Sequence, residues 1–157
     1  MRVKASLFCL FILLASSIST AQELVPSDPA YALKGLKSLG VLVEGLKEKA
    51  IKIGLSEDRL RTIAELKLRR EGIEVLEYGS FPQLYINVNV LSRAFNITIK
   101  IQEWVQLRRD PSIECFGVTW DDSVTGSYEG GAEYIVDTLN QALEVFLNDY
   151  YRANPKK

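Results

Sequence analysis

The chain of 157 residues contains no histidine, one methionine and two cysteines. Without histidine, neither a Ser-His-Asp nor a Cys-His catalytic system can form, and no metal ion can be bound by imidazole. The absence of this one residue type therefore excludes the arrangements on which many small exported hydrolases depend.

The first 21 residues are expected to be a secretory signal peptide. A basic start is followed by an apolar run over residues 5–15, which is shorter than the roughly 20 residues that span a bilayer. Ser19-Thr20-Ala21 then supplies small side chains of the kind that signal peptidase requires. We expect cleavage before Gln22, with no stable membrane span afterwards.

The remaining residues, 22–157, are expected to form a single α/β domain, because 136 of the 157 residues are enough for one core. Cys9 leaves with the signal peptide, so Cys115 has no intramolecular disulfide partner. Of the 19 basic residues, Arg2 and Lys4 are also removed, which leaves 17 against 20 acidic residues and a net charge of −3. This balance disfavours a nucleic-acid partner. No cofactor is expected.

The first half of the domain is predicted to alternate between strands and helices. Residues 40–46 have the β-branched, apolar character of a strand, and a short helical stretch is expected before Gly54. Ser56 is a suitable N-cap for a longer helix that ends at Gly72. Its apolar residues recur at helical spacing: Leu60, Ile63, Ala64 and Leu68. A short strand over 73–77 and a turn over 79–82 follow.

The clearest strands lie over residues 84–91 and from Phe95 to Arg108, where apolar and polar residues alternate strictly. Glu103 alone interrupts the apolar face of the second strand. Asp110-Pro111 is predicted to be a turn, and residues 121–126 another. Between them a last strand is expected to turn three side chains inward: Phe116, Val118 and Trp120.

A long amphipathic helix is predicted at the carboxy terminus, because apolar residues recur there at intervals of three and four. Its core-facing stripe includes Ile135, Leu139, Leu143 and Phe146. The whole pattern indicates an α+β fold: an antiparallel or mixed sheet of about four to five strands with two main helices packed on one face.

The polar side of the two long strands is the candidate binding surface. It combines aromatic rings with amides, a mixture that suits contacts with a partner or ligand. The residues are Tyr85, Asn87, Asn89, Lys100, Gln102 and Trp104. A solvated sheet face is the alternative interpretation. Trp104 favours the binding surface, since an exposed tryptophan is less usual than an exposed glutamine. If a helix covers this face the ring is structural, and if the face is open the ring is a candidate anchor for a partner.

Glu103 is the one candidate for acid–base chemistry, since a carboxyl group on an apolar face can be buried with a raised pKa. A β-bulge would instead move it towards solvent. No catalytic residue and no metal ligand is predicted.

The order of elements, ending in a run of antiparallel strands and a long helix, resembles domains of the bacterial envelope. The layout is similar to the amino-terminal domain of the Tol-Pal system's periplasmic propeller protein and to the soluble domain of the curli secretion channel. The resemblance depends on Val41-Leu42-Val43, on the helix end Arg69-Arg70-Glu71-Gly72-Ile73 and on Leu84-Tyr85-Ile86-Asn87-Val88. The chain has neither a propeller nor transmembrane hairpins. The resemblance implies a small exported bacterial α/β protein that is not catalytic and works through partners.

These features favour a non-enzymatic periplasmic or secreted protein that acts through an envelope protein, in envelope assembly or transport. A carrier of a small molecule or lipid is an alternative, and it would need a cavity of roughly 300 Å³ or more between sheet and helices. A hydrolase built on carboxylates alone is a second alternative, and it would need Glu103 to lie beside another carboxylate in a cleft.

Overall fold

The structure is a computed structural model that describes residues 27–127 and 131–155. The expected signal peptide and its cleavage site lie outside the described residues. Within those ranges, no helix is both long enough and apolar enough to cross a bilayer.

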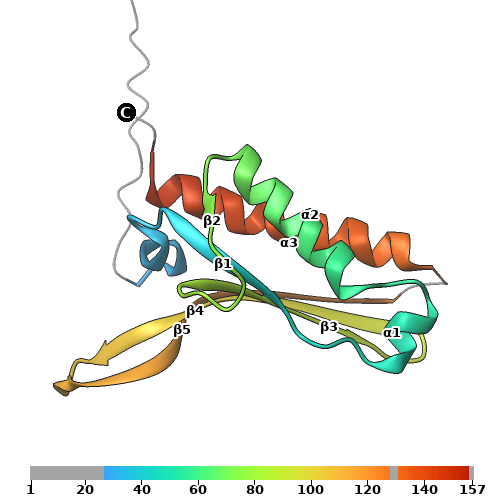
Figure 1. Cartoon of the computed structure of the whole chain (residues 1–157), viewed down its shortest axis with the longest axis horizontal. Coiled ribbons are helices and arrows are strands. Elements are labelled where there is room, and N and C mark those ends of the chain that lie inside the picture. Colours follow the sequence, from blue (N-terminus) through green and yellow to red (C-terminus); the bar gives the residue numbers. More distant parts are fainter. Residues whose placement is uncertain (1–26, 128–130, 156–157) are drawn as a thin grey trace, which may run out of the picture.

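A five-stranded mixed sheet with two long helices on one face forms the molecule (Figure 1). The strand order is β2-β1-β3-β4-β5; β1 runs parallel to both β2 and β3, whereas β3, β4 and β5 are antiparallel. The elements in chain order are η1 (Pro29–Leu33), β1 (Ser38–Val43), α1 (Glu48–Lys52), α2 (Glu57–Arg70), β2 (Glu74–Val75), β3 (Gln83–Val90), β4 (Ala94–Leu107), β5 (Asp110–Ser127) and α3 (Ala132–Ala153). The predicted α+β fold class is confirmed.

Helix α2 begins and ends where the sequence indicates. The side chain of Ser56 accepts a hydrogen bond from the backbone N–H of Arg59 at 3.2 Å, which caps α2. Gly72 follows the helix with a φ of 80°, a conformation that glycine adopts without steric cost. Two ion pairs then join α2 to α3 along their length: Arg59–Glu133 and Lys67–Glu144.

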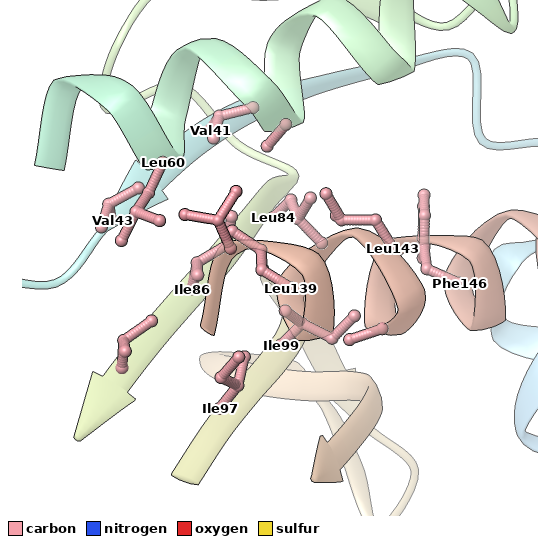
Figure 2. Close-up of a cluster of buried hydrophobic side chains, with 14 of the residues drawn as sticks. Val41, Val43, Leu60, Leu84, Ile86, Ile97, Ile99, Leu139, Leu143 and Phe146 are labelled. Atoms are coloured by element: carbon pink, nitrogen blue, oxygen red, sulfur yellow. The ribbon is translucent and has the colours of Figure 1, made fainter. Parts of the chain in front are cut away.

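The core lies between the helices and one face of the sheet. Apolar side chains from β1, β3 and β4 meet those of α2 and α3 there, as Figure 2 shows for residues that include Val41, Leu60, Ile86, Ile99 and Leu139. The stripe predicted on the carboxy-terminal helix is confirmed as buried: Ile135, Leu139, Leu143 and Phe146 are each at most 1% exposed. The opposite face of the sheet, here called the open face, has none of the described helices packed on it (Figure 1).

The hairpin of β4 and β5 extends beyond the part of β4 that pairs with β3. Strand β3 pairs with β4 only as far as Gln83 opposite Gln102, and β4 continues to Leu107. Residues 103–118, here called the arm, therefore form a two-stranded ribbon that extends beyond the helices (Figure 1). Every residue from 108 to 114 at its tip is exposed.

Two of the three predicted inward side chains of the last strand face the open side. Trp120 is buried, but Phe116 and Val118 are 45% and 49% exposed. The cause is a β-bulge, because Ile101 lies opposite Trp120 whereas Gln102 lies opposite Val118. Thr119 is the extra residue, so the side chains on either side of it point to opposite faces.

Both turns predicted around the last strand are wrong. The hairpin turns at residues 108–109, and Asp110-Pro111 already belongs to β5. Residues 121–126 continue the same strand, paired with β4 along their length. Gly126, which suggested the turn, is needed for packing instead: a Cβ there would lie 2.9 Å from ring atoms of the buried Phe95.

Candidate functional site

The six predicted binding residues all lie on the open face, on neighbouring strands. Tyr85, Asn87 and Asn89 come from β3, and Lys100, Gln102 and Trp104 from β4, with Tyr85 directly opposite Lys100. Tyr85, Asn87, Asn89, Lys100 and Gln102 are half-buried, and Trp104 is 61% exposed. The structure thus brings the predicted set onto one surface, whose two ends differ in chemistry.

One end of the open face is a hydrogen-bonded polar network around Glu44. The Tyr85 hydroxyl and the Asn87 amide both donate to the Glu44 carboxylate, and Asn89 donates to Asn87. Burial and the bond to Glu44 together raise the pKa of Tyr85 to about 12. Sequence reasoning missed Glu44, since it follows the end of β1 and only the parallel β1–β3 pairing brings it beside Asn87.

Further pairs of neutral polar groups lie on the same face of the sheet. The Thr98 hydroxyl donates to Asn96 at 3.1 Å, and the Asn96 amide donates to the hydroxyl of Thr125 on β5 at 3.0 Å. Gln83 donates to Gln102 at 2.9 Å. Because these amides and hydroxyls form hydrogen bonds with one another, this part of the open face resembles an ordinary solvent-facing side of a sheet.

The other end of the open face is an exposed aromatic cluster of Phe81, Trp104 and Phe116. The centroid separations of the ring pairs are 5.1 Å for Phe81–Phe116, 5.9 Å for Trp104–Phe116 and 6.3 Å for Phe81–Trp104, all edge-to-face. Each pair lies in the favourable range for such contacts. All three side chains nevertheless remain accessible, with 39% of Phe81 exposed.

Three separate segments assemble this aromatic cluster. Trp104 and Phe116 lie opposite each other on the arm, and the bulge at Thr119 is what turns Phe116 to this side. Phe81 arrives from the turn before β3, which is held close to β1 by a bond from the Gly40 N–H to the Pro82 carbonyl at 2.9 Å. Sequence reasoning placed Phe116 in the core, since alternation alone carries no sign of a bulge.

Glu103 lies beside a hydroxyl group. It is half-buried at the base of the arm, and its carboxylate accepts a 2.6 Å hydrogen bond from the hydroxyl of Thr119. The bond ties the residue to the bulge.

Within residues 27–127 and 131–155, no three His, Cys, Asp or Glu side chains gather in a way that could hold a metal ion.

A shallow depression between α2 and α3 has a volume of about 250 Å³. It is open to solvent and is lined by Ile63, Leu66, Lys67, Arg70 and Asn140. This volume is below the roughly 300 Å³ typical of ligand pockets, and all the lining residues belong to the two helices, with none from the sheet. It does not provide the interior cavity that a carrier would need.

No protein-family model matches the chain, and no curated protein matches its sequence significantly.

Proposed function

We propose that this is a non-enzymatic exported protein of the bacterial periplasm that binds an envelope protein through its aromatic cluster, in envelope assembly or transport. The observation that carries the proposal is the exposure of Phe81, Trp104 and Phe116 at the junction of arm and sheet. The resemblance in layout to envelope domains that work through partners supports the same assignment.

The size of the aromatic cluster fits the centre of a protein interface. With 39–61% of each side chain exposed, three rings offer roughly 300 Å² of apolar surface. Exposed patches of about 300–600 Å² are often functional on monomeric proteins. A standard interface buries about 800 Å² per partner, so the cluster would be its core and the surrounding amides its polar rim.

The rigidity of the aromatic cluster also favours binding. Trp104 and Phe116 stand on paired strands, and each ring also packs edge-to-face on the other two rings of the cluster, so part of their side-chain entropy is lost before a partner covers them. Tryptophan is enriched among the residues whose truncation costs most in interfaces.

The test is affinity capture from envelope extract with a matched pair of variants. Trp104→Ala combined with Phe116→Ala removes the core of the proposed interface, whereas Leu91→Ala removes an exposed apolar side chain elsewhere, 67% accessible. We expect a protein captured by the wild type and by Leu91→Ala but lost, at least tenfold, with the double variant. Equal recovery with all three proteins would contradict the proposal.

A further inference from the structure

We propose that the depression between α2 and α3 binds the carboxy-terminal residue of a peptide whose last side chain is apolar. The depression lies on the helical side of the molecule, whereas the aromatic cluster lies at one end of the open face of the sheet (Figure 1). The two surfaces share no residue, so this inference does not depend on the proposed function.

Two side chains of α2 form the apolar part of the depression. Ile63 is partly buried and packs against the core, whereas Leu66 is 46% exposed and does not belong to the core cluster. Residues three apart lie on the same face of a helix, so these two side chains form one small aliphatic surface. A single apolar side chain placed on this surface would be partly removed from water, and so would Leu66.

Arg70 supplies the charge of the depression. It lies on the same face of α2, one turn after Leu66 and two turns after Ile63. The other four basic residues of this helix each form an ion pair with a described residue: Arg59, Arg61, Lys67 and Arg69. Arg70 forms none with any described carboxylate. Its guanidinium group is therefore available to an anion, and it pairs best with a carboxylate that accepts two parallel hydrogen bonds.

The remaining lining residues favour a peptide over a simple fatty acid. Lys67 is paired with Glu144, so Arg70 provides the single unmatched charge of the lining. The side-chain amide of Asn140 is half-buried and has no hydrogen-bond partner among the described residues. A side-chain amide both donates and accepts, which matches the peptide group that precedes a terminal carboxylate. A fatty acid has no group that would use this amide.

The size and openness of the depression also fit the end of a chain. Its volume of about 250 Å³ is smaller than the roughly 300 Å³ or more of pockets that enclose small-molecule ligands. It is open to solvent, so the residues that precede the bound one can continue outwards. One carboxylate, one peptide group and one apolar side chain account for each chemical group that lines it.

Titration of the purified protein, followed by NMR, tests the site. The probe is acetyl-Gly-Ser-Gly-Ala-Leu with a free terminal carboxylate. The same peptide with a terminal amide removes the charge, and octanoate keeps an apolar carboxylate without peptide groups. We expect chemical-shift changes centred on Leu66, Arg70 and Asn140, with a dissociation constant roughly tenfold lower for the acid peptide than for either control.

Arg70→Gln and Arg69→Gln are the matched variants. Arg69 is the neighbouring residue, but it is paired with Glu65 and does not line the depression. Arg70→Gln should abolish the preference for the acid peptide over its amide, whereas Arg69→Gln should leave that preference unchanged. Asn140→Leu should weaken binding of the acid peptide several-fold without weakening that of octanoate. Thermal unfolding shows whether each variant is folded.

Several results would overturn the proposal. Equal dissociation constants for the acid and amide peptides would show that Arg70 does not recognise a carboxylate. An equal loss with Arg69→Gln and Arg70→Gln would show a general effect of charge rather than a site. Octanoate binding as tightly as the acid peptide would assign the depression to fatty acids, and no shift change at millimolar peptide would show that it binds neither.

Discussion

Two tryptophans on the same hairpin have opposite roles. Trp120 is 2% exposed, packs edge-to-face on Phe146 and donates its indole N–H to Asp149 at 3.0 Å. Trp104 is 61% exposed and contacts only the other two rings of the aromatic cluster among the described aromatic pairs. The sequence predicted a polar-face position for Trp104 and an inward position for Trp120, and the structure agrees on both.

The two tryptophans therefore predict different costs of truncation. Trp120→Ala should lower the free energy of unfolding by about 3–5 kcal/mol, the usual cost of emptying a buried aromatic site. Trp104→Ala should cost about 1 kcal/mol or less, since only ring–ring contacts at the surface are lost. Urea unfolding measures both. A loss of several kcal/mol with Trp104→Ala would show the ring to be structural and would remove the main support for the binding surface.

Tyr85 predicts an alkaline loss of stability. Its pKa is raised to about 12 from an ordinary value of 10 by burial first and by the bond to Glu44 second. The folded state thus holds the phenol proton more tightly than the unfolded state, so the stabilisation is complete below pH 10 and is lost as the pH rises towards 12. The hydrogen bond to Glu71 likewise raises the pKa of Tyr151 to about 12, so Tyr151 adds to the same loss of stability.

The measurement is the free energy of unfolding as the pH is raised from 10 towards 12. Tyr85→Phe should reduce the slope of this free energy against pH, because the variant has no phenol proton to lose. Tyr31→Phe, at a tyrosine that is 40% exposed, is the matched control. Equal slopes in Tyr85→Phe and the wild type would show that the Glu44 network does not hold the proton.

The elements that the sequence predicted well are those specified by local signals. The helix after Ser56 has its cap, its apolar spacing and its terminal glycine within one continuous segment, and the strands ending at Val90 and Leu107 alternate strictly. The bulge at Thr119 arises from how β5 is paired with β4, which no local pattern encodes. That pairing moved Phe116 from the predicted core to the candidate site.

Gly40 is the point at which β1 and the turn carrying Phe81 approach each other. A Cβ at this position would lie 2.4 Å from the carbonyl oxygen of Ser80, a backbone atom that cannot move independently. Gly40→Ala should therefore displace the turn and cost at least about 2 kcal/mol of unfolding free energy. It should also loosen the aromatic cluster, visible as altered near-ultraviolet circular dichroism.

The matched control for this close approach is Gly45→Ala. A Cβ there meets only a carboxylate oxygen of Glu57, at an ordinary 3.8 Å. We expect a change within about 0.5 kcal/mol. If the two alanine variants were equally stable, the turn would not be fixed by its contact with β1.

At the scale of the whole molecule, the protein divides into a packed body and a projecting arm. The core cluster contains no residue between Gln102 and Thr119, and a two-stranded ribbon by itself is marginally stable in water. An arm that contributes little to the core but exposes Trp104 and Phe116 fits the proposed role of the aromatic cluster in binding a partner. The sequence predicted the fold class correctly but not this division into body and arm. The division is visible only from how far β4 and β5 extend beyond their pairing with β3.

The body should therefore fold without the arm. Gln102 and Val118 lie opposite each other, so an Asn-Gly turn that replaces residues 103–117 can join them as a two-residue hairpin. We expect cooperative urea unfolding with a free energy within about 2 kcal/mol of the wild type, because few buried contacts are removed.

Trp120 becomes the only tryptophan, and its fluorescence should be blue-shifted relative to the wild type, since its ring is 2% exposed. The spectral control is Trp104→Phe in the full-length chain, because this variant keeps the arm and has Trp120 as its single tryptophan. A variant that fails to unfold cooperatively, or whose fluorescence resembles exposed tryptophan, would show that the arm is part of the folding unit and not an appended interaction surface.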